Sequence, residues 1–178
     1  MSKARLIISC LLLTGFLSQA QAWEPDPADK QQLEVKAAIL GLLEKDPGMK
    51  DWFDNSAGYA VFPKVGKGGI GIGGAFGKGL VISADQVVGN TSLSQLSIGL
   101  QLGGQVYSEF IFFYDHTALD DFKRGNFELG AQASAVAATA GASADASYNR
   151  GVAIFTNVSG GLMYEASVGG QKFSYEAR

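Results

Sequence analysis

A glycine-rich tract constrains the fold of this chain more than any other feature of its sequence. Residues 66–79 contain eight glycines in fourteen positions, and the apolar residues 59–65 lead into them. Ile70, Ile72 and Phe76 alternate with glycine or other small residues, so a β-strand here has one apolar face and one nearly bare face. Because glycine weakens a strand, the run predicts close approach of another backbone, a sharp bend, or a ligand against the main chain.

The first 22 residues are typical of a signal peptide. A basic start and an apolar run over 6–17 precede Ala20 and Ala22, the small residues that predict cleavage after Ala22. The apolar run is shorter than the roughly 20 residues that a membrane-spanning helix needs. We therefore expect an exported protein, periplasmic or peripherally attached to the envelope, in which residues 23–178 form one domain.

Composition narrows the class of partner. Without the signal peptide, 12 of the 14 Lys and Arg residues remain against 17 Asp and Glu, a net charge near −5. The lack of Lys and Arg clusters argues against nucleic acid, whose binding depends on many phosphate contacts. The only cysteine, Cys10, lies in the expected signal peptide, so the exported chain would have no disulfide, thiolate metal site or cysteine nucleophile.

Two helices are expected at the start of the domain. Asp26 and Pro27 suit the N-cap and first turn of a helix that runs to about Lys45. Its apolar stripe consists of Leu33, Ala37, Leu40 and Leu43, widened by Val35, Ile39 and Leu42. A second, short helix is expected over 47–55, before Gly58 turns the chain into strands.

The rest of the domain is expected to be mainly β. Alternation over 90–102 and a dense apolar run over 106–114 predict two strands, the second buried on both faces. Residues 117–120 resemble a capping box for a short helix that ends at Gly125. Residues 127–148 favour a strand of small side chains over a helix.

Three further short strands close the pattern, and their spacing is typical of a meander: 152–158, 162–168 and 172–175. The elements together predict an α+β fold. In it the N-terminal helices pack on a curved, mainly antiparallel, glycine-rich β-sheet that is barrel-like or a sandwich.

Catalytic motifs are absent or unconvincing. Residues 69–74 fit G-x-G-x-x-G, but so do 66–71, and neither opens a helix in a βαβ unit. His116 is the only histidine, and the neighbouring Asp115 and Asp120 suit the caps of a turn better than a metal site. No Gly-x-Ser-x-Gly elbow occurs. We expect no enzyme activity, no cofactor and no metal.

The glycine tract and its surroundings resemble a known family. The stretch 58–69, followed by Gly73, Gly74 and 77–79, closely resembles the opening signature of the SYLF domain. Later stretches are also similar to that family: 97–105, 127–131 and 160–165. The resemblance covers roughly Leu33 to the end. It implies a lipid-binding domain without established catalysis, with phosphoinositides and actin as ligands of eukaryotic members and export for bacterial members.

Residues and resemblance together predict a non-enzymatic lipid-binding protein of the bacterial envelope that associates peripherally with anionic headgroups. Lys64, Lys67 and Lys78, in loops beside the glycine strand, would meet those headgroups. Main-chain amides of residues 66–69, which include Gly68 and Gly69, would add hydrogen bonds, as backbone nests do for anions. The alternative without a ligand is that the lysines are solvated surface charges that keep a glycine-rich edge from aggregating.

Insertion of apolar side chains would have to strengthen such binding, because three lysines give only weak, salt-sensitive attachment. Trp52 and Phe53 are the candidates for this membrane contact, although a Trp-Phe pair beside a helix also suits a core. Actin enters only through the family analogy.

Two other classes stay open at this stage. One is a structural or protein-binding periplasmic module with an envelope protein as partner, in which the glycines serve tight packing. The other is a small outer-membrane β-barrel, since about 120 residues after the helices could supply eight strands. The ending 173–178 lacks a terminal aromatic residue, which argues against the barrel.

Overall fold

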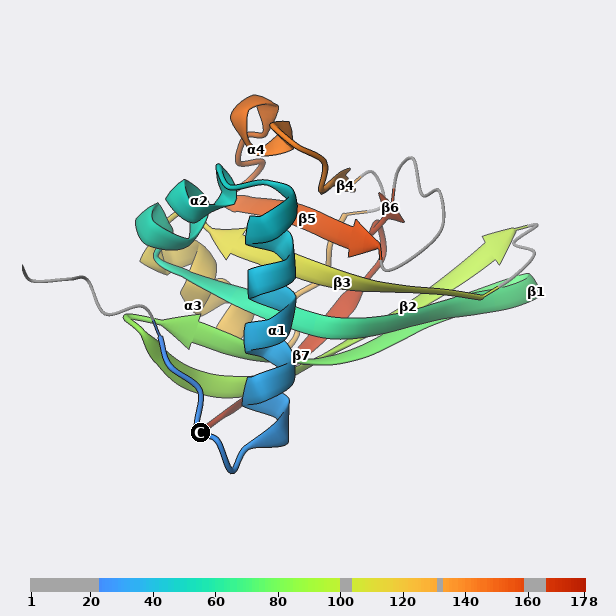
Figure 1. The fold of residues 1–178 in the computed structure, drawn as a ribbon. Coiled ribbons are helices and arrows are strands. Elements are labelled where there is room, and N and C mark those ends of the chain that lie inside the picture. The colour runs from blue at the N-terminus through green and yellow to red at the C-terminus, as the bar shows by residue number, and fades with distance from the viewer. Residues whose placement is uncertain (1–22, 100–103, 131–132, 159–165) are drawn as a thin grey trace, which may run out of the picture.

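The computed structural model describes residues 23–99, 104–130, 133–158 and 166–178 (Figure 1). Its elements in chain order are α1 (Lys30–Lys45), α2 (Met49–Asn55), β1 (Gly58–Ser83), β2 (Gln86–Gly99), β3 (Gly104–Phe113), α3 (His116–Lys123), β4 (Ser134–Ala137), α4 (Ala142–Asp145), β5 (Val152–Val158), β6 (Ala166–Ser167) and β7 (Lys172–Ala177). The predicted α+β class is confirmed. The expected signal peptide lies outside the described residues, and no helix in the described part is long and apolar enough to cross a membrane.

Within the described residues, one seven-stranded open sheet organises the fold, with the strand order β6-β4-β5-β3-β1-β2-β7. Neighbours pair antiparallel except β4 and β5, which pair parallel. The predicted C-terminal meander is wrong, because β5 pairs with β3 whereas β7 pairs with β2 at the other edge. Each of these strands pairs with a strand far from it in the sequence, and local turn signals do not indicate such distant partners.

Strand β1 turns back on itself instead of running straight. Its 26 residues would span about 85 Å if fully extended. However, residues from the two ends of β1 meet, because the Ser83 hydroxyl donates to the carbonyl of Ala57, just before the strand, at 2.8 Å. Further along the strand, a Cβ added to Gly77 would lie 2.9 Å from Val65 Cγ2. The first half of β1 pairs with β3 and the second half with β2. The glycine tract therefore forms the far end and the return of this long strand.

The outer ends of β1, β2 and β3 project well beyond α1 in Figure 1. We call this part the tongue, and it consists of residues 64–78 of β1, 93–99 of β2 and 104–107 of β3. Sheet pairing continues along the tongue, with Gly74 opposite Leu96 and Gly66 opposite Val106.

The nearly bare face of the glycine tract is the buried face. Small residues on it are buried: Gly73, Ala75, Gly77 and Gly79. A Cβ added to Gly79 would lie 2.8 Å from Phe62 Cδ1 and closer still to the Val61 carbonyl oxygen. The predicted close approach of another backbone is thus confirmed, and that backbone is the first half of the same strand.

Helix α1 covers one face of the sheet, with α2 beside it. Its N-cap is Asp29, whose carboxylate accepts from the Gln31 and Gln32 amides, so the predicted cap at Asp26 is wrong by three residues. The side chains that it buries are Val35, Ile39 and Leu42, whereas Leu33 and Leu40 of the predicted central stripe are 44% and 56% exposed. The helix is apolar on several sides, and packing on the sheet selected which of them is buried.

The opposite face of the sheet packs on α3 and on the C-terminal segments. Asp115 caps α3 by accepting from the Ala118 amide at 2.9 Å, and this replaces the predicted capping box that began at Thr117. Gly125 ends this helix as predicted, with a φ of 76°. Only β4 and the short α4 form in the described part of 127–148, where a longer strand was expected.

Candidate functional site

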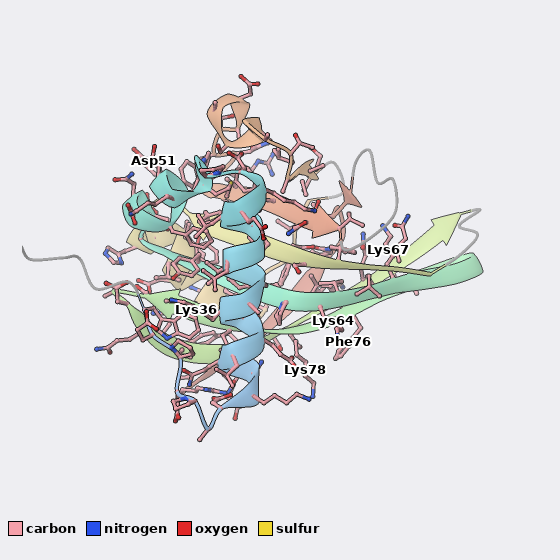
Figure 2. All side chains as sticks on the ribbon, in the orientation of Figure 1. Lys36, Asp51, Lys64, Lys67, Phe76 and Lys78 are labelled. Carbon is pink, nitrogen blue, oxygen red and sulfur yellow. The ribbon has the colours of Figure 1, made fainter. Side chains whose placement is uncertain are left out.

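An open groove lies between the N-terminal half of α1 and the tongue. It has a volume of about 600 Å³ and is lined by Lys30, Gln31, Glu34, Pro63, Lys64, Phe76, Gly77 and Lys78. Figure 2 shows Lys64, Phe76 and Lys78 close together beside α1. Two of the three lysines predicted from the sequence therefore meet in one place, together with an aromatic ring and a helix that sequence reasoning did not assign to the site.

A polar contact positions α1 against β1 at this groove. The Gln31 side-chain amide donates to the Gly79 carbonyl at 3.1 Å. The absence of a side chain at Gly77, which lines the groove, allows β1 to pack against its own first half. The glycine tract thus shapes the groove by letting the two halves of β1 lie close together.

The groove carries an excess of positive charge. Lys64 and Lys78 are exposed, and neither forms an ion pair within the described part of the chain. Lys30 pairs with Glu34 at 3.6 Å, one helical turn along α1. With one acid against three lysines, the groove favours an anionic group.

Exposed apolar side chains lie next to these lysines. Phe76 is 55% exposed, and Leu96, on the same face of the tongue, is 77% exposed, while Val106 elsewhere on the tongue is 47% exposed. The shared face follows from the strand register, because Leu96 lies opposite Gly74 and side chains two positions apart in a strand share a face. The combination of apolar side chains with a lysine rim is typical of surfaces that contact a membrane interface.

Lys67 lies in a different environment from Lys64 and Lys78. It is partly buried in the tongue, and burial lowers its pKa while the charge of Glu109 raises it. All three lysines belong to β1, so the predicted placement in loops is wrong. Gly68 pairs with Gly104 of β3, which uses this stretch of backbone in the sheet instead of leaving it as an open anion nest. Gly69 is the next residue of the same strand.

Glu109 of β3 is the residue that the sequence analysis missed. It is fully buried, and its Oε2 accepts from the Gln171 side chain at 3.0 Å while its Oε1 has no partner. Burial raises the pKa of Glu109 to about 8, against the opposing effects of the Gln171 hydrogen bond and the Lys67 charge. The available signal was an acid inside an apolar run that predicted burial on both faces.

Trp52 and Phe53 do not lie with the lysines. They form an aromatic cluster between α2 and the sheet, with Trp52 5.0 Å from Phe155 and Phe53 4.9 Å from both Tyr59 and Phe112 between ring centroids. Both are partly buried. Their insertion into a membrane stays a prediction, and the structure brings Phe76 to the lysines instead.

The second half of the chain is similar to a known protein family. Residues 94–177, from within β2 to within β7, match the family described as "Ysc84: Las17-binding protein actin regulator". Residues 94–177 are thus similar to a Ysc84 (SYLF) domain. The resemblance seen in the glycine signature is thereby confirmed from a separate stretch of the chain.

A curated relative extends the similarity to the SYLF domain beyond that stretch. "Beta cell expansion factor A" of Aeromonas veronii is 29% identical over 138 residues, which make up 76% of this chain and 52% of the relative. The chain thus spans about half the length of this relative. The SYLF family is a binding module, which fits a site made of an open groove and an exposed apolar face.

Proposed function

We propose that this protein binds anionic lipid surfaces of the cell envelope, with the groove and the adjoining face of the tongue as the contact. The observation that carries the proposal is that Lys64 and Lys78, which form no ion pair with any described residue, flank the exposed ring of Phe76. Headgroup phosphates would meet the lysines while Phe76 and Leu96 enter the interface. Export through the N-terminal signal peptide, with a periplasmic or peripheral location, is part of the same proposal.

Magnitudes support a contact that uses both kinds of side chain. Each lysine near an anionic surface contributes about 1 kcal/mol, so Lys64 and Lys78 together give weak, salt-dependent attachment. Full burial of a Phe or Leu side chain contributes roughly 1.5–3 kcal/mol, and the exposed parts of Phe76 and Leu96 would supply a share of that. Removing either kind of side chain should therefore weaken binding measurably.

The family context supports a module of the lipid-binding or actin-binding type in general. The matched family is described as a Las17-binding actin regulator, and its members are binding modules. The site in this chain offers positive charge and exposed apolar surface, which suit a phospholipid interface, and we carry actin over to this protein only as a family analogy.

The charge part of the proposal is tested by vesicle flotation of residues 23–178. Wild-type protein should float with anionic vesicles at low salt and be released by high salt. Lys64→Gln with Lys78→Gln should bind about 30-fold more weakly, the equivalent of about 2 kcal/mol. The matched control is Lys50→Gln with Arg124→Gln, which removes the same net charge from exposed side chains outside the groove. Equal losses in both double variants, or no binding by wild type, would reject the proposed site.

The apolar part is tested in the same assay. Phe76→Ser should reduce vesicle binding, and Leu40→Ser should not, although the two side chains are almost equally exposed at 55% and 56%. Leu40 lies on α1 outside the lining of the groove, so it serves as the matched control. Circular dichroism would establish that both variants keep the fold.

A further inference from the structure

A second hollow lies at the α2 end of the molecule, away from the lysine groove. It has a volume of about 210 Å³ and is lined by Asp51, Trp52, Asn55, Tyr114 and Tyr148. Figure 2 shows Asp51 on α2, well away from Lys64, Phe76 and Lys78. None of these residues lines the lysine groove.

Three aromatic rings form the hollow, and their positions are fixed by contacts with the rest of the fold. The Trp52 indole N–H donates to the Ser143 carbonyl at 3.2 Å. The centroid of the Tyr148 ring lies 4.9 Å from that of Trp52 and 5.1 Å from that of Tyr114. Tyr114 itself is 64% exposed, an unusual exposure for a ring directly after a fully buried strand end. A preorganised aromatic surface is therefore open to a ligand.

The charge at this hollow is negative. Asp51 is exposed and forms no ion pair within the described part of the chain, and no lysine or arginine lines the hollow. Its neighbour Asp54, by contrast, pairs with Lys50. The Asn55 side-chain amide donates to the Asp51 backbone carbonyl at 2.8 Å, which leaves the Asp51 carboxylate available.

We propose that this hollow binds a quaternary ammonium group. Aromatic faces attract a cation through their quadrupole, and a methylated ammonium needs no hydrogen-bond acceptors, so rings can replace its water. The Asp51 carboxylate balances the charge. A volume of about 210 Å³ is below the 300–1,000 Å³ of ordinary ligand pockets and suits a single such group. Both a free choline-like molecule and the choline headgroup of a lipid carry this chemistry.

The first test is a titration with tetramethylammonium chloride, with potassium chloride at equal ionic strength as reference. The chain has two tryptophans, so the Trp23→Phe background makes Trp52 fluorescence the reporter. A saturable change with a dissociation constant of about 1–10 mM is expected for the organic cation alone. An equal response to potassium, or no saturable response, would overturn the proposal.

Variants assign the response to the hollow. Tyr114→Leu should weaken binding at least 10-fold, whereas Tyr114→Phe, which keeps the ring, should stay within twofold of the parent. Asp51→Asn should weaken it several-fold, and Asp54→Asn, on the same helix but outside the hollow, should not. Binding by Tyr114→Leu at the parent's affinity would reject the site.

Two further arms identify the source of the cation. Competition by free choline without flotation on neutral phosphatidylcholine vesicles would indicate a soluble ligand, and flotation abolished by Tyr114→Leu would indicate the lipid headgroup. Either result supports the site. Flotation on anionic vesicles should be unaffected by Tyr114→Leu, so this inference and the proposed function succeed or fail separately.

Discussion

Glu109 shows how a single buried carboxyl group affects the stability of the whole fold. It lies on the central strand β3, opposite Thr156 of β5, and both Glu109 Oε1 and Thr156 Oγ1 are buried without a hydrogen-bond partner. Tyr107, two residues earlier on the same strand, has a buried hydroxyl, and burial and the Glu109 charge raise its pKa against the opposing effect of a Gln171 hydrogen bond. A charge at this position is therefore costly in the folded protein.

The free energy of unfolding should consequently fall as pH rises from about 4.5 to about 8. In that window the folded protein retains the Glu109 proton, because its pKa is about 8, whereas the unfolded chain has released it near the ordinary value of 4.5. The slope contributed by this residue is at most about 1.4 kcal/mol per pH unit, and it vanishes below and above the window. Urea unfolding of wild type and Glu109→Gln across this range measures it. The variant should match wild type near pH 4.5 and be more stable at pH 8, and parallel curves would contradict the assignment.

At the scale of elements, the fold depends on how closely the two halves of β1 approach. Gly79 lies under the Phe62 ring and against the Val61 carbonyl, so any side chain there would force these atoms apart. Gly66 belongs to the same tract, but an added Cβ would meet nothing within 4 Å. Close packing of the strand therefore requires glycine at position 79 but not at position 66.

Alanine substitution should separate the two positions. Gly79→Ala should lower the free energy of unfolding by about 2 kcal/mol or more through overpacking, whereas Gly66→Ala should change it by no more than about 0.5 kcal/mol. Denaturant unfolding of both single variants gives the comparison. Similar losses at both positions would contradict the close-packing explanation, because an added methyl group meets nothing at Gly66 and a loss of unfolded-chain entropy would stabilise the variant instead.

The sequence predicted the existence of most elements better than their arrangement. The density of glycine over 66–79 predicted close backbone approach, a bend or a ligand, and the structure shows the close approach. The sequence could not indicate that the approaching backbone was 61–65, because contact between the two halves of one long strand leaves no local signal. On α1 the apolar residues surround much of the helix, so burial of Val35 instead of Leu33 was decided by the sheet. For the site, the lysines were identified from their position beside the glycine tract, whereas Phe76 became a candidate only when its exposure was known.

At the scale of the whole molecule, Arg178 connects three distant parts of the chain. Its Nη1 donates to the Asp29 carboxylate at 2.6 Å, its Nε donates to Asn90 Oδ1 at 2.9 Å, and its backbone amide donates to the Val88 carbonyl. The hydrogen bond from Arg178 is the largest cause of the lowered pKa of Asp29. Arg178, the residue after β7, thereby links the C-terminal segment to the N-cap of α1 and to β2.

Arg178→Met should therefore lower the free energy of unfolding by about 0.5–1 kcal/mol, a fall in Tm of about 1–4 °C, and raise the pKa of Asp29 toward its ordinary value. The matched control is Arg124→Met, whose ion pair with Asp121 is more exposed, at 73% and 47% against 30% and 23%. That variant should change Tm by no more than about 1 °C. Thermal unfolding measures both variants, and a larger fall in Tm for Arg124→Met than for Arg178→Met would refute the assignment.

The register of the sheet also sets an order for folding. Strands β1 and β2 begin pairing at Ser83 and Gln86, three residues apart, whereas β2 and β7 pair from Gly89 to Ala177, most of the described chain apart. Closing a long loop costs entropy before any contact repays it, so the local ribbon forms early and β7 docks late. Until it docks, the outer edge of β2 has unsatisfied amides and carbonyls. This edge is where a newly made chain is most exposed to misassembly with its neighbours.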